Sequence, residues 1–167
     1  MIKLTKRYIR MCEKAKELQN EWIIRVGDYI AERGYYDVGI VIDITKDNIV
    51  KVLYSKHFAP MVTDEIAIVG IAGTVDWVKK HKVWLPIQEQ IQEMVKEVIG
   101  CSDNEPVTLA LIKEFEYHPI ISMWGYEIKY ESDNELWLAW LMDLKYGRVW
   151  DNEREEWIKN EERNRGK

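Results

Sequence analysis

The residues best suited to chemistry form one basic and aromatic cluster. Residues 79–82 read Lys-Lys-His-Lys and are flanked by Trp77 and Trp84. Lysine ammonium groups pair with phosphates and aromatic rings stack on unpaired bases, so this cluster could bind single-stranded nucleic acid. The other interpretation is an exposed hairpin turn whose tryptophans face inward. The sequence favours the turn, because the chain carries a formal net charge of −5 and a pI near 5.4.

No other set of residues has the spacing of a catalytic or metal-binding motif. The three histidines, His57, His81 and His118, lie in separate segments, and neither cysteine completes a zinc-ligand pattern with them. The chain has no phosphate-binding glycine loop and no GxSxG nucleophile elbow, and Cys101 is followed by acidic residues that disfavour a reactive thiolate. We therefore predict no catalytic residue, metal or cofactor. An enzyme would need a pocket that sequence spacing does not reveal.

The tryptophans are the second candidate feature, since the chain has eight of them and only two phenylalanines. Trp22, Trp137 and Trp140 lie on apolar stripes and are predicted core residues, whereas the other five could be buried or exposed. Aromatic residues with a charged rim are typical of protein interfaces, so we expect a protein partner or self-association into a homo-oligomer. The candidate interaction surface comprises Trp77, Lys79, Lys80, Lys82, Trp84, Trp124 and Trp150.

Composition limits the class of protein that positions these residues. With 167 residues, 47% hydrophobic and 32% charged, the chain has enough apolar surface for a folded core and is not a disordered protein. Its longest apolar run, residues 66–78, is interrupted by Gly70, Gly73 and Asp76, so no membrane span is predicted. The charged N-terminus does not resemble a signal peptide, and Cys12 and Cys101 fit free thiols of a reducing cytoplasm.

The N-terminal half is predicted to combine one helix with a small sheet. Apolar residues spaced by three or four indicate a helix over Thr5–Asn20. The sequence favours a stripe directed to the core, and the alternative is a partner-binding face. Tyr36–Ile44 and Ile49–Ser55 flank a Lys-Asp-Asn turn and predict a hairpin. Ile66–Ile71 and Val75–Leu85 are predicted as further strands, although residues 66–69 could instead begin a short helix.

The strand segments and the Gly27-Asp28 pair resemble SH3-like small barrels. In such a barrel the glycine allows a tight bend and the carboxylate accepts backbone amides. The resemblance implies binding of peptides or nucleic acids, at the level of fold analogy only.

The C-terminal half is predicted to be mainly helical. One helix follows Pro86 and ends at Gly100, and a second runs from Val107 to about Tyr117. Residues 120–130 are predicted as a strand or extended loop. Ser132 and Glu135 form a capping-box pattern, which predicts the start of a third helix that ends at Gly147. From residue 151 the sequence is a charged tail, predicted to be frayed beyond residue 158.

Three stretches resemble small phage- and prophage-encoded proteins of Gram-positive bacteria. They are residues 11–28, residues 83–94 (Val-Trp-Leu-Pro-Ile-Gln-Glu-Gln-Ile-Gln-Glu-Met) and residues 135–150, which contain Trp137, Trp140 and Trp150. The resemblance implies an accessory protein of phage or prophage origin. It implies no activity, catalytic residue or cofactor.

Together these features predict an α+β protein with an N-terminal helix, a small curved or SH3-like barrel sheet and a C-terminal helical part packed on it. The β-rich half would cover residues 1–85 and the helical half residues 86–158, sharing one core, before a frayed tail at 159–167. The predicted function is that of a non-enzymatic interaction or regulatory accessory protein in the cytoplasm. The alternative is a nucleic-acid-binding accessory protein that uses the sheet and the basic cluster.

Overall fold

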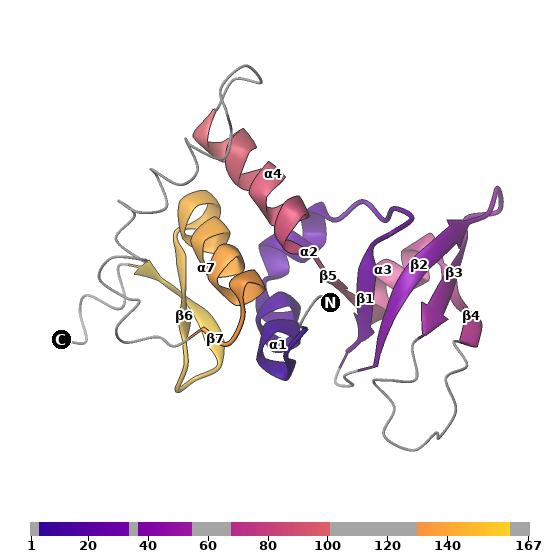
Figure 1. The fold of residues 1–167 in the computed structure, drawn as a ribbon, viewed down its shortest axis with the longest axis horizontal. Coiled ribbons are helices and arrows are strands. Elements are labelled where there is room, and N and C mark those ends of the chain that lie inside the picture. Colours follow the sequence, from indigo (N-terminus) through magenta and orange to yellow (C-terminus); the bar gives the residue numbers. More distant parts are fainter. Residues whose placement is uncertain (1–3, 34–36, 55–67, 101–129, 161–167) are drawn as a thin grey trace. The chain divides into compact units, whose positions relative to one another are not determined.

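The computed structural model describes residues 4–33, 37–54, 68–100 and 130–160 and shows an α+β fold (Figure 1). The chain forms two compact units. The β-rich unit is Cys12–Pro86, and the helical unit is Met1–Met11 with Ile87–Lys167. The sequence-based division at residue 85 and the shared core stay predictions. The predicted turn, helix and extended segment within residues 101–129 lie outside the described residues.

The predicted N-terminal helix is two helices, α1 (Lys6–Lys14) and α2 (Lys16–Glu21). Ala15 separates them because its ψ of 68° is not helical, and its amide donates to the carbonyl of Cys12, only three residues earlier. The break leaves the apolar stripe intact, so its predicted direction toward the core is confirmed. The buried residues of the stripe are Tyr8, Met11, Ala15, Leu18 and Trp22.

Five antiparallel strands form the sheet of the β-rich unit. They are β1 (Tyr29–Glu32), β2 (Val38–Ile44), β3 (Ile49–Tyr54), β4 (Ile68–Thr74) and β5 (Lys82–Leu85). Their order is β4-β3-β2-β1-β5, so the first four strands form a meander and the fifth returns to the first. The predicted β2–β3 hairpin is confirmed, and the strand predicted over Val75–Leu85 is wrong except for its last four residues.

The sheet is curled, as the sequence predicted, for two local reasons. The pairing of β2 with β3 shifts between Val41 and Asp43, and the pairing of β3 with β4 shifts between Val50 and Lys51. Such bulges bend a strand and increase its twist. The Tyr54 ring also covers two glycines on the neighbouring strands, since a Cβ on Gly39 or Gly70 would lie 3.0 or 3.3 Å from it. Within the described residues β4 and β5 remain the two edges, so the sheet is a half-barrel.

Helix α3 (Val75–His81) replaces the first part of the strand predicted to end at Leu85. Thr74 starts the helix, because its Oγ1 accepts a hydrogen bond from the Trp77 amide at 3.3 Å. Val78 is then the one fully buried side chain of the helix. The strand pattern resumes at Lys82, whose segment pairs with β1.

A buried carboxylate fixes the entry to the sheet. Asp28 is 2% exposed, and its Oδ2 accepts hydrogen bonds from the Trp22 indole at 2.9 Å and from the Arg25 amide at 2.8 Å. Gly27 precedes it with a φ of +95°, a conformation that favours glycine. The sequence-based role of this pair, a bend with a carboxylate that accepts backbone amides, is therefore confirmed.

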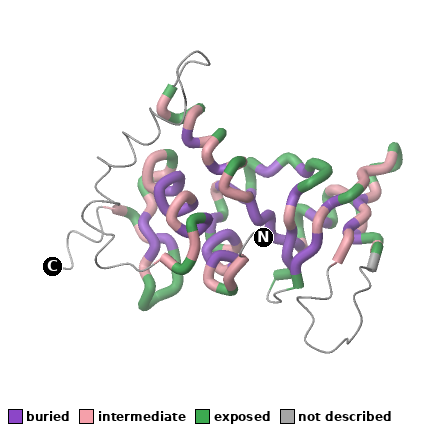
Figure 2. Tube along the Cα trace, viewed as in Figure 1, coloured by how far each residue is buried: buried purple, intermediate pink, exposed green. Residues whose placement is uncertain are grey.

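The helical unit is built on α4 (Gln88–Ile99) and α7 (Asp133–Tyr146), which pack against each other. Both helices end at the predicted glycines, Gly100 and Gly147. In α4 the inward residues are Ile91 and Val95, while Val98 is exposed. Figure 2 shows the continuous run of buried residues along α7.

The predicted capping box at the start of α7 is only half formed. Ser132 Oγ accepts from the Glu135 amide at 3.4 Å, as a capping serine should. The Glu135 carboxylate, however, is fully buried and accepts from the Glu131 amide at 2.8 Å and from the Thr5 hydroxyl. Arg7 Nε lies 3.8 Å from it. Glu135 therefore joins the N-terminal segment to α7 instead of returning to the backbone of Ser132.

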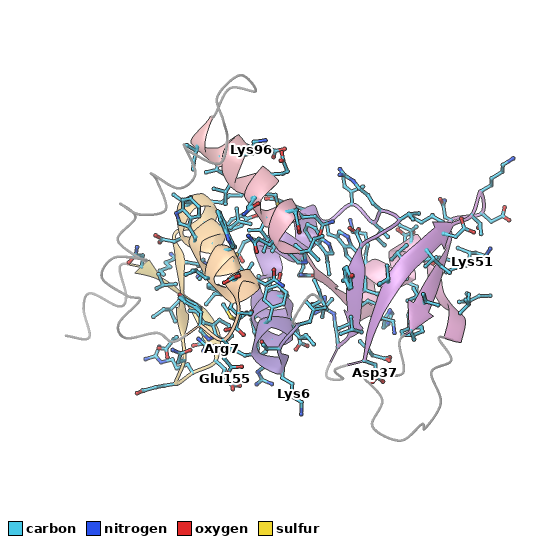
Figure 3. The ribbon with its side chains drawn as sticks, in the orientation of Figure 1. Lys6, Arg7, Asp37, Lys51, Lys96 and Glu155 are labelled. Atoms are coloured by element: carbon cyan, nitrogen blue, oxygen red, sulfur yellow. The ribbon has the colours of Figure 1, made fainter. Side chains whose placement is uncertain are left out.

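The charged segment predicted as the start of a tail is a hairpin, so that prediction is wrong up to Lys159. Strand β6 (Arg148–Asp151) pairs with β7 (Glu156–Lys159), and the Asp151 carboxylate accepts two amides of the intervening turn. Trp150 and Trp157 face each other across the pair, with ring centroids 5.1 Å apart. The Trp157 indole also donates to the Met11 carbonyl at 2.9 Å. Aromatic packing thus holds a turn whose charge indicated only a tail. Figure 3 labels Glu155 in this turn.

The two extremes of tryptophan burial give a matched stability test. Trp140 is fully buried in α7, whereas Trp77 is 41% exposed. Replacing a buried tryptophan with alanine removes apolar burial and leaves a cavity, so Trp140→Ala should lower the free energy of unfolding by about 3–5 kcal/mol. Trp77→Ala should lower it by much less. Denaturant unfolding of both variants measures the difference, and equal losses would contradict the assigned burial.

The Asp28 carboxylate gives a second stability test. Asp28→Ala leaves the buried Trp22 indole and the Arg25 amide without their acceptor, at a cost of about 1–3 kcal/mol for each unsatisfied group. Asp28→Asn keeps one acceptor oxygen and should cost less. Thermal and denaturant unfolding would rank wild type above the asparagine variant and the asparagine variant above alanine. An alanine variant as stable as wild type would show that this carboxylate does not fix the entry to the sheet.

Candidate functional site

Trp77 is the exposed ring of the predicted basic and aromatic cluster, and it lies on α3 rather than in a hairpin turn. The His81 ring stacks on it with centroids 4.3 Å apart and planes inclined by 19°. His81 is held there by a 2.9 Å hydrogen bond between its Nδ1 and the Trp77 carbonyl. Gly73 on β4 also lies close against the indole. A Cβ atom added at that position would be only 2.9 Å from the ring. Trp77 is therefore a fixed, partly exposed apolar surface.

The three lysines of the cluster have different environments. Lys79 and Lys80 are exposed in the last turn of α3. Lys82 is buried on β5, with its Nζ 3.5 Å from the Glu32 carboxylate and 5.5 Å from the centre of the Trp77 ring. A lysine that is buried and paired in this way is not available to bind phosphate. Only the first two lysines can contact a partner in solution.

The remaining tryptophans of the predicted surface do not join Trp77. Trp84 is buried on β5 and stacks on Trp22, with ring centroids 6.1 Å apart and nearly parallel planes. Trp150 is buried in the β6–β7 hairpin of the other unit. Trp124 lies outside the described residues. The structure thus brings together Trp77, Lys79 and Lys80, and it places Trp84 and Trp150 in cores.

Strand β4 carries two exposed side chains that the sequence-based search missed. Val69 is 59% exposed and Ile71 is 73% exposed, while Ala72 is buried. These residues lie on the strand that leads directly into α3 and Trp77. In the sequence of this strand, large aliphatic residues alternate with glycine or alanine. That alternation predicts two different faces, but it does not indicate which face is exposed to solvent. We call Val69 and Ile71 the β4 surface; Ile71 is opposite Lys51 in the register, whereas Gly73, against which Trp77 packs, is opposite the buried Val50.

The outer face next to the β4 surface carries a compensated charge pair. Lys51 on β3 is opposite Ile71 in the strand register, and its Nζ lies 2.9 Å from the Asp43 carboxylate (Figure 3). The hydrogen bond from Lys51 and the attraction of its charge hold the pKa of Asp43 below its ordinary value. The two charges neutralise each other, so this side of the β4 surface has no net charge from them.

No protein-family model, curated protein or solved structure matches this chain. The function is therefore argued from the chain's own surface.

Residues that could support enzyme or metal chemistry are not gathered in the described part of the chain. Among residues 4–33, 37–54, 68–100 and 130–160, no three histidine, cysteine or acidic side chains form a group that could hold a metal ion. Of the three histidines only His81 is described, and its ring is stacked on Trp77. None of the described helices is both long and apolar enough to cross a bilayer.

The Asp43–Lys51 pair yields a titration test. Because the folded-state pKa of Asp43 is lowered, the pair stabilises the fold above the unfolded pKa, and this contribution is lost as pH falls through the folded pKa. In Lys51→Met the pKa of Asp43 should rise toward its ordinary value. NMR titration of the Asp43 carboxyl in both proteins measures the shift. An unchanged Asp43 pKa would mean that the pair does not form in solution.

Proposed function

We propose that this chain is a non-enzymatic interaction protein, of regulatory or accessory type, that binds another protein through the β4 surface. The observation that supports the proposal is the exposure of Val69, Ile71 and Trp77 along one strand and the helix that follows it. Single exposed aliphatic residues are ordinary, but here two β-branched side chains of one strand are exposed together. The polar rim would come from the neighbouring Lys79 and Lys80.

Trp77, on α3, is a second exposed apolar side chain, and it is rigid. Its ring is fixed by His81 and by the close approach to Gly73, which has a φ of +125° that favours glycine. A side chain that is already ordered loses little conformational entropy when a partner covers it. We extend the proposal to an accessory role of phage or prophage type in the cytoplasm, as the sequence features indicate.

Binding of single-stranded nucleic acid is the second candidate function, favoured by the exposed lysines beside Trp77. It is the weaker candidate for two reasons. Lys82 is buried against Glu32, and the His81 ring already occupies part of the indole surface on which a base would stack. The chain as a whole is also acidic, with a net charge of −5.

A peptide-display selection on the full chain tests the proposed function. Clones selected on wild type should bind Ile71→Lys at least about tenfold more weakly, because the new charge lies in the centre of the β4 surface. The matched control is Ile23→Lys, since Ile23 is equally exposed at 69% but lies between α2 and β1. Clones that bind all three proteins equally, or no enriched clones, would contradict the proposal.

Two further measurements separate the alternatives. Sedimentation of wild type, Ile71→Lys and Ile23→Lys over a concentration series identifies self-association, which only the first substitution should disrupt. Titration of labelled single-stranded DNA and RNA at about 50 mM salt identifies nucleic-acid binding, because phosphate contacts are strongest at low salt. Binding that is lost in Lys79→Ala and Lys80→Ala but kept in Ile71→Lys would favour the second candidate function.

A further inference from the structure

The break between α1 and α2 has no local cause in the sequence. Residues 12–18 read Cys-Glu-Lys-Ala-Lys-Glu-Leu, without a glycine or a proline, and alanine is the strongest helix former among the amino acids. The buried stripe also continues through Ala15 at intervals of three and four residues. A helix that stops within such a sequence is interrupted by a contact from elsewhere in the fold.

That contact is the indole of Trp157. In an unbroken helix the Ala15 amide would donate to the Met11 carbonyl, four residues earlier. Here the Met11 carbonyl accepts instead from the Trp157 indole at 2.9 Å. The Ala15 amide donates to the Cys12 carbonyl at 3.2 Å, only three residues earlier. Trp157 is buried on β7 and its ring packs on that of Trp150, so the β6–β7 hairpin supplies the donor that replaces the helical one.

Each half of the broken helix is anchored by side chains of its own compact unit. On the side of α1, Arg10 Nε lies 2.8 Å from the Glu155 carboxylate in the turn of the β6–β7 hairpin. On the side of α2, the Gln19 side-chain amide donates to the Trp84 carbonyl at 3.0 Å and accepts from the Trp84 amide at 2.8 Å. The break thus lies close to the point where the chain passes from the helical unit into the β-rich unit.

We propose that residues 6–21 are a two-state element and that the β6–β7 hairpin is its latch. With the Trp157 indole on the Met11 carbonyl, the helix is broken at Ala15, as in this structure. When the hairpin withdraws, the Ala15 amide takes the Met11 carbonyl and the two helices join. Helices of nine and six residues are too short to be stable alone, and joining them adds backbone hydrogen bonds without a second nucleation step. This device is independent of the β4 surface.

Removal of the indole donor tests the latch. Trp157→Phe keeps an aromatic ring in the hairpin but has no N–H, whereas Trp150→Phe makes the same change on the facing strand and leaves the Met11 bond in place. In Trp157→Phe the NMR Cα chemical shift of Ala15 should move into the helical range. The amides of residues 16–18 should exchange about tenfold more slowly, because the first amides of α2 gain carbonyl partners in α1.

The Trp150→Phe protein is the matched control and should keep the wild-type chemical shift and exchange rates. A folded Trp157→Phe protein with an unchanged Ala15 shift would overturn the inference. Equal changes in both variants would also overturn it, because they would trace the effect to the aromatic pair and not to the indole donor of Trp157.

Proline substitutions test the broken state without any change to the hairpin. Lys16 is exposed at the first position of α2, where proline is favoured, so Lys16→Pro should leave the midpoint of denaturant unfolding unchanged. Lys14→Pro, at an exposed residue within α1, should lower the midpoint, because proline removes a helical hydrogen bond and its ring clashes with the preceding turn. Equal losses for both variants would mean that the helix is already continuous and would overturn the inference.

A double variant joins the two tests. Proline at residue 16 forbids a continuous helix, so adding Lys16→Pro to Trp157→Phe should return the Ala15 chemical shift to its wild-type value. A helical Ala15 shift that persists in the double variant would show that the signal does not report on joining of the two helices, and it would overturn the two-state assignment.

Discussion

The buried hydrogen bonds of Asp28 are the constraint on which the arrangement of the β-rich unit depends. A carboxylate that is removed from water must be satisfied by donors, and here the donors are the Trp22 indole and the Arg25 amide. This fixes the path of the chain from α2 into β1 and holds the Trp22 ring against Trp84 on β5. With Gln19 bonded to the same strand, β5 is the closed edge of the sheet. Within the described residues the other edge of the sheet is β4.

The parts of the fold that the sequence predicted are those determined by local chemistry. The β2–β3 hairpin follows from β-branched residues on both sides of a short polar turn, and α7 follows from a capping serine and a terminal glycine. The sequence-based predictions were wrong where contacts between residues far apart in the sequence determine the local structure. Seven residues are too few for periodicity to separate α3 from a strand, and the β6–β7 hairpin depends on two tryptophans that its charged turn conceals. Glu135 likewise left its local capping role for the Thr5 hydroxyl, far away in sequence.

The candidate surface was only partly predictable for the same reason. Composition drew attention to Trp77 and to the lysines of α3, but burial depends on which strand lies beside each residue. Pairing of β5 with β1 buries Lys82 and Trp84, although both have the residue types of a binding site. Ile71 is exposed because it projects from the same face as its cross-strand partner Lys51, whereas the opposite face carries the buried Val50 and Val52. An isolated aliphatic residue in a sequence gives no indication of such a face.

The Gln19 amide has a consequence for stoichiometry. A sheet with two open edges can receive one copy on each side and so extend head to tail without limit, as in fibrils. Gln19 supplies β5 with both a donor and an acceptor, and it thereby closes that direction of growth within the protein's own fold. One glutamine side chain thus occupies, from within the fold, the outward amide and carbonyl of Trp84 that a neighbouring strand would otherwise use.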